Sequence, residues 1–194
     1  MTADQNPLPA LIQQLEACDA ATALGILETA ASRHPRNPHV LMLLAAQYMQ
    51  GRNADHAEAA YLAALQIAPG LDIARFQLGL LQLTGGRPAT AAITWAPLNL
   101  LGNTHPLRLF KLALDHLQQD EIDAACRHLR EGMKYNVDNA PLNRDMQVLL
   151  EKLEASQQRR PAGQTPETSA SAAAPTAEPG TGTHFLLATY QSLH

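Results

Sequence analysis

Residues 39–69 read HVLMLLAAQYMQGRNADHAEAAYLAALQIAP, and this stretch decides the fold. Both of its halves carry apolar residues at helical spacing, and the GRNAD between them is typical of a turn. Alanines alternate with larger side chains, as two closely packed helices require. The stretch therefore predicts a helix–turn–helix hairpin. The positions that carry this pattern are Leu41, Leu44, Ala45, Tyr48, Ala57, Tyr61, Ala64 and Pro69.

The same pattern recurs at a constant interval without a gap, in frames that start at residues 4, 38, 72 and 106. Turn signals recur between the two halves of each later frame, in QGRNAD (50–55), TGGRP (84–88) and QQDEID (118–123). Small residues recur where the two helices of a hairpin must approach. These residues are Ala45, Gly79 and Ala113 in the first helices, and Ala23, Ala57, Ala91 and Ala125 in the second helices.

These intervals resemble the tetratricopeptide repeat (TPR), a helix–turn–helix unit of about 34 residues. The resemblance covers residues 4–157 and is carried best by the last three frames, since Leu11 stands where the first frame should have a small residue. It implies an all-α fold, a right-handed superhelix of about four TPR repeats. After the last frame, residues 139–156 (NAPLNRDMQVLLEKLEAS) have apolar residues at helical spacing, which predicts a capping helix at about 141–156.

Pro97 interrupts the second helix of the third frame. A proline inside a helix removes a backbone hydrogen bond and clashes with the preceding turn. We therefore expect this helix to kink or break near Trp95, with a separate turn at residues 98–101. The break is either a local irregularity or a bend that reshapes the binding surface.

Residues 156–183 contain no Val, Ile, Leu, Met, Phe, Trp, Tyr or Cys, which predicts a disordered linker at 158–183. Residues 184–194 (HFLLATYQSLH) are apolar again, with Phe185, Leu186, Leu187 and Tyr190. Burying these four side chains contributes roughly 6–12 kcal/mol, and ordering about seven residues costs roughly 7–14 kcal/mol. We expect a weak recognition peptide. It docks on its own chain or on a neighbouring copy, or it recruits another protein; the alternative is a frayed end without a role.

The TPR resemblance also implies a binding wall, since positions 2, 5, 9 and 12 of each repeat line the concave groove of this family. These positions are almost all apolar in the last three frames, which predicts a groove for an apolar helix or extended peptide. Two alternatives remain open: the side chains thicken the core, or a second subunit covers them. The groove residues are His39, Met42, Ala46, Met49, Ile73, Phe76, Leu80, Leu83, Leu107, Phe110, Leu114 and Leu117.

One binding mode of the family is not expected, the clamp that grips a chaperone's terminal carboxylate with Lys, Arg and Asn. Position 9 of the first two frames holds Ile12 and Ala46, and the clamp positions of the fourth frame offer only the cation of Lys111. A carboxylate would find too few donors here.

Composition places further limits on function. The net charge is −4 with no long run of either sign, so no basic face for nucleic acid is expected. No apolar run reaches the roughly 20 residues that span a bilayer, and the first residues do not resemble a signal peptide. The two cysteines, Cys18 and Cys126, form no CxxC motif, which fits a reducing compartment. We expect a cytoplasmic protein without membrane insertion.

Catalytic motifs are not found in the sequence, and no cofactor or metal is expected. Cys126 and His128 are two residues apart on a helix, a spacing that points their side chains away from each other. The leading hypothesis is a non-catalytic adaptor or scaffold that binds a protein or peptide with an apolar segment, or self-associates through residues 184–194 and the groove. The alternative is a dedicated chaperone for a client of a secretion or assembly system. A Cys/His enzyme is the least supported reading.

Overall fold

The computed structural model describes residues 7–16 and 18–159, and within these ranges the chain forms helices, turns and loops without a strand. The expected all-α class is confirmed. The elements are α1 (Leu8–Glu16), α2 (Ala20–Arg33), α3 (Pro38–Gln50), α4 (Ala54–Ile67), α5 (Asp72–Thr84), α6 (Pro88–Trp95), the 3₁₀ helix η1 (Ala96–Leu100), α7 (Pro106–Gln118), α8 (Ile122–Tyr135) and α9 (Ala140–Arg159).

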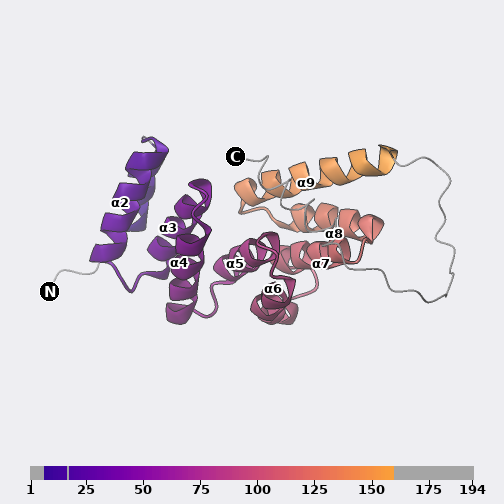
Figure 1. The fold of residues 1–194 in the computed structure, drawn as a ribbon, viewed down its shortest axis with the longest axis horizontal. Coiled ribbons are helices and arrows are strands. Elements are labelled where there is room, and N and C mark those ends of the chain that lie inside the picture. Colours follow the sequence, from indigo (N-terminus) through magenta and orange to yellow (C-terminus); the bar gives the residue numbers. More distant parts are fainter. Residues whose placement is uncertain (1–6, 17, 160–194) are drawn as a thin grey trace, which may run out of the picture. The chain divides into compact units, whose positions relative to one another are not determined.

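The chain divides into two compact units, Met1–Ala96 and Pro97–His194. In the first unit each of the helices from α2 to α5 packs against the next one in sequence. In the second unit α8 packs against both α7 and α9. Figure 1 shows α3 beside α4 and α7 beside α8. Each unit is therefore built from contacts between neighbours in sequence.

The helices begin at regular intervals. The second helix of each hairpin begins at residue 20, 54, 88 or 122, and the first helix of the last three begins at residue 38, 72 or 106. Both series advance by the same interval as the sequence frames. Several of these starts carry local signals. The side-chain oxygen of Asn37 accepts hydrogen bonds from the backbone N–H of His39 and Val40, and Pro38 occupies the first turn of α3.

The turns inside the three complete hairpins are the same structure. The residue after the C-cap adopts a left-handed backbone in each, with φ of 55° at Arg52, 74° at Gly86 and 59° at Asp120. Asn53 N–H donates to the Tyr48 carbonyl at 2.8 Å, and Arg52 N–H to the Met49 carbonyl at 3.0 Å. The other two turns repeat both bonds at the equivalent positions of the next two frames. This is a Schellman ending, which satisfies the last carbonyls of the first helix and reverses the chain.

Gly79 explains how α5 and α6 come together. A Cβ atom at Gly79 would lie 2.1 Å from Nε1 of Trp95, so the indole occupies the space that a side chain would take. Trp95 is fully buried, and its Nε1–H donates to the Phe76 carbonyl at 3.0 Å. The Phe76 and Trp95 rings stack with centroids 6.0 Å apart. The small residue that the sequence placed at this helix–helix contact is thus required there.

The predicted break at Pro97 is present. α6 ends at Trp95, and Ala96–Leu100 continue as a 3₁₀ helix. Leu98 is buried and Leu100 is almost fully exposed. The missing proline N–H ends the α-helical bonding, and a tighter turn still places Leu98 in the interior.

The second unit contains a similar packing contact, in which an aromatic ring lies against a glycine. A Cβ atom at Gly132 of α8 would lie 2.4 Å from Cε1 of Phe110, which is fully buried. α9 buries Leu142, Met146, Leu149, Leu150 and Leu153, the apolar face expected of the last helix. It ends at Arg159, beyond the residue 158 at which the linker was predicted to begin. The predicted linker from residue 160 onward and the peptide at 184–194 lie outside the described residues.

None of the helices in the described ranges combines the length and the hydropathy that a membrane crossing requires.

Candidate functional site

The twelve predicted groove residues divide into two groups of different exposure. His39 is exposed, and Met42, Ala46, Met49, Ile73, Leu80 and Leu117 are partly buried. The other five are buried, with exposures of 0% for Phe76, Phe110 and Leu114, 4% for Leu83 and 8% for Leu107. The accessible part of the predicted wall therefore concentrates on α3.

The prediction that Phe76 and Phe110 line an accessible groove has to be corrected, because both side chains belong to the core. Phe76 stacks on Trp95, and Phe110 lies against the bare backbone of Gly132. The physical reason is the glycine in each hairpin. Phe110 itself fills the space left by the missing side chain of Gly132, whereas Phe76 stacks on Trp95, the ring that fills the space over Gly79.

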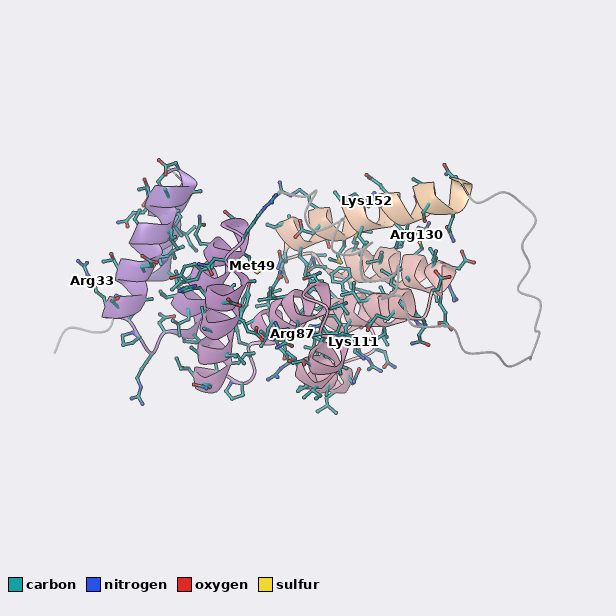
Figure 2. The ribbon with its side chains drawn as sticks, in the orientation of Figure 1. Arg33, Met49, Arg87, Lys111, Arg130 and Lys152 are labelled. Carbon is teal, nitrogen blue, oxygen red and sulfur yellow. The ribbon has the colours of Figure 1, made fainter. Side chains whose placement is uncertain are left out.

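Met42 and Met49 lie at the edge of the core cluster formed by Ala45, Ala57, Tyr61 and their neighbours. Both remain partly exposed, and Figure 2 shows Met49 on α3. An unbranched thioether side chain can adjust its shape while one side stays packed. Both side chains therefore remain partly accessible on α3.

A pocket of about 400 Å³ lies in the first unit between α1, α2 and α3, and is called the α1–α3 pocket below. Its apolar lining comes from all three helices: Ile12, Leu15, Ala23, Leu27, Leu43 and Ala46. Its remaining lining residues are Cys18, Ala20, Gln47 and Gln50. No lining residue carries a formal charge.

The α1–α3 pocket joins equivalent positions of the first two frames. Ile12 and Leu15 stand one repeat period before Ala46 and Met49, two of the predicted groove residues. The groove positions are predicted only for the last three frames, so Leu15 is a lining residue that the sequence prediction does not include. Leu15 could have been predicted by applying the same repeat interval to the first frame, because it lies one interval before Met49.

Hydrogen bonds at the α1–α3 pocket connect two of its helices and cap one of them. Gln47 Nε2 donates to the Ala20 carbonyl at 3.0 Å, which ties the start of α2 to α3. Asp19 caps α2 by accepting from Thr22 N–H at 2.9 Å, and this bond lowers the pKa of Asp19. The Cys18 thiol is partly buried and free of a disulfide. The pocket thus offers an apolar surface with amides on its rim.

A second cleft, of about 530 Å³, lies between α1 and α2 on residues that include Leu11, Gly25 and Ile26. Its lining also includes Arg33 and His34, so it differs from the α1–α3 pocket in offering a cation. The two clefts share no lining residue.

Glu58 is the centre of a polar network that links α4, α5 and the start of α6. Arg87 donates to its two carboxylate oxygens at 3.0 and 2.7 Å. Buried Gln82 donates to Glu58 at 3.0 Å and accepts from the Thr94 hydroxyl at 2.6 Å. The hydrogen bonds from Arg87 lower the pKa of Glu58. Every member has a partner, so we assign this network to stability rather than to ligand binding.

The cysteine and histidines of the second unit do not form a nucleophile pair. Burial raises the pKa of the Cys126 thiol, which favours the unreactive protonated form. The His128 ring stacks instead on His116, with centroids 5.1 Å apart, and burial followed by the charge of His116 lowers the pKa of His128. His116 Nδ1 lies 2.5 Å from a Glu121 carboxylate oxygen.

Within residues 7–16 and 18–159, no group of three or more His, Cys, Asp or Glu side chains is placed to hold a metal ion. The other predicted binding element, Phe185, Leu186, Leu187 and Tyr190, lies outside the described residues. The sequence matches no model of a known protein family and no curated protein.

Proposed function

We propose that this chain is a non-catalytic interaction module of the tetratricopeptide type, which holds an apolar peptide or helix of a protein partner in the α1–α3 pocket. The TPR assignment is supported by helix starts that advance by one constant interval and by three identical left-handed turns at the same spacing. About four repeats in a right-handed superhelix, closed by α9, are part of this proposal.

The α1–α3 pocket is the observation that carries the binding proposal. Its volume of about 400 Å³ falls within the range of natural ligand sites, roughly 300–1,000 Å³. Its lining is apolar and uncharged, which excludes a carboxylate or phosphate group as the main recognition element and favours leucine-like or aromatic side chains. Exposed Ile12 and partly exposed Met49 extend this apolar surface along α1 and α3.

A role without catalysis is supported by the state of the candidate nucleophiles. Cys126 is 3% exposed and its pKa is raised, so a reagent would find neither access nor a thiolate. The lining of the α1–α3 pocket includes the Cys18 thiol but no His, Asp, Glu, Lys or Tyr side chain that could act beside it as a general acid or base.

Peptide selection with matched variants tests this proposal. A random peptide library is panned against the full chain, against Ala46→Arg and against Ala59→Arg. Ala46 lines the pocket, whereas Ala59 is exposed on α4 and lies outside it, so both changes place the same side chain on a helix surface. We expect peptides rich in leucine and aromatic residues, with binding weakened at least tenfold by Ala46→Arg and unchanged by Ala59→Arg. Selected peptides that bind all three proteins equally would refute the assignment of the site.

A further inference from the structure

We infer that residues 184–194 of this chain dock in the α1–α3 pocket and compete there with the peptide of a partner. This inference rests on the proposed function, because it treats the pocket as a peptide site. It adds the identity of one occupant of the pocket, and it implies that this occupant and a partner compete for the same site.

Among the parts of the chain outside the described ranges, residues 184–194 have the side chains that best match the apolar lining of the pocket. Residues 1–6, 17 and 160–183 contain a single large apolar side chain, that of Met1. Residues 184–194 contain five: Phe185, Leu186, Leu187, Tyr190 and Leu193. Only this segment can supply the apolar groups that the pocket lining would cover.

The lack of charged side chains in the segment favours the α1–α3 pocket over the second cleft as its docking site. Residues 179–194 contain no Asp, Glu, Lys or Arg, and the pocket lining has none either. The second cleft presents Arg33, for which this segment offers no acidic side chain. The apolar side chains of the segment lose no ionic hydration on entering an uncharged pocket, so they fit this pocket better than the second cleft.

Twenty-four residues, 160–183, separate the end of α9 from the segment. α9 ends at Arg159, and residues 160–183 span at most about 80 Å when extended. A flexible tether of 24 residues has a mean span of roughly 25–30 Å, and it holds its end at an effective concentration near 1 mM around a site that lies within this span. A peptide that binds with a Kd of about 0.1 mM would then be bound about 90% of the time. The segment would block weak ligands and yield to tighter ones.

Cys18 is a natural reporter of occupancy, since it lines the pocket and is partly exposed. The only other cysteine, Cys126, is buried and has a raised pKa. The experiment measures the rate at which N-ethylmaleimide modifies each cysteine, with the modified residue identified by peptide mass spectrometry. The parent full chain is compared with a chain carrying Phe185→Ser, Leu186→Ser, Leu187→Ser and Tyr190→Ser. The matched control changes four linker residues to serine: Ala170, Ala172, Ala173 and Ala174.

We expect Cys18 to react about tenfold faster in the chain with the four changes in segment 184–194, and at the parent rate in the linker control. A synthetic peptide of residues 184–194, added at millimolar concentration, should restore the slow rate. The parent rate should not change between 1 and 100 µM protein, because the segment acts on its own chain.

Three outcomes would overturn the inference. Equal Cys18 rates in the parent and the four-serine chain would mean that the segment does not occupy the pocket. A parent rate that slows with protein concentration would assign the pocket to the segment of a second copy. If the segment gives no protection but a library-selected peptide does, this inference fails and the proposed function stands; if neither protects Cys18, both fail.

Discussion

Replacing Gly79 with alanine tests the packing principle on which the first unit depends. The new Cβ atom would lie 2.1 Å from Nε1 and 2.4 Å from Cδ1 of Trp95. Ordinary contact needs about 3.4 Å or more, so the indole has to move by more than about 1 Å. Overpacking of this kind costs typically 1–3 kcal/mol.

The displacement has a second cost. Trp95 Nε1–H donates to the Phe76 carbonyl at 3.0 Å inside the core, and a shifted indole leaves this donor without a partner. A buried, unpaired donor costs about 1–3 kcal/mol. Alanine gains about 1 kcal/mol over glycine in a helix interior. The expected net result is a loss of about 1–5 kcal/mol in the free energy of unfolding.

Gly25→Ala is the matched control, because Gly25 lies inside α2 and an added Cβ atom there meets nothing within 4 Å. We expect this variant to gain about 0.5–1 kcal/mol from helix propensity. Trp95 is the only tryptophan of the chain, so urea unfolding followed by its fluorescence reports the first unit directly. If Gly79→Ala is as stable as the parent, or gains stability as Gly25→Ala does, the account of the α5–α6 contact is wrong.

Two further predictions concern the turns and the polar network of the first unit. Arg52→Gly should raise stability by about 0.5–1 kcal/mol and Gly86→Ala should lower it by about 1 kcal/mol, because both residues have a left-handed backbone that glycine adopts more easily; urea midpoints that move in the same direction would contradict this. Glu58→Gln should lower stability at pH 7 by about 1 kcal/mol. The folded pKa of Glu58 is below its ordinary value of 4.5, so its contribution is present above that value and is lost as the pH falls through the folded pKa. The parent should therefore lose more stability than Glu58→Gln between pH 7 and pH 3, and equal losses in thermal melts would refute the role of this carboxylate.

Much of the helical architecture could be read from the sequence because its determinants are local. The recurring alanines and turn residues predicted hairpins at one constant interval, and the helix starts follow that interval. Pro97 predicted the end of α6, since a proline acts on its own turn of helix whatever the surroundings. The repeated Schellman turns likewise depend on a few consecutive residues.

The exposure of the candidate wall could not be read in this way. Phe76 and Met42 occupy equivalent positions of successive frames, yet Phe76 is fully buried and Met42 is partly exposed. What separates them is a residue in another helix, since Trp95 covers Gly79 and stacks on Phe76. A periodic pattern assigns a side chain to a face of its own helix but does not show what fills the space opposite.

The sequence by itself thus determined where the helices begin, end and turn, because those choices depend on residues a few positions apart. Only the tertiary structure decided which part of the apolar wall remains accessible. It includes Ala46 of α3, which lines the α1–α3 pocket together with Ile12 of α1. The physical reason is that accessibility depends on the volumes of side chains from separate helices that meet at one point, and the spacing along any one helix does not contain this information.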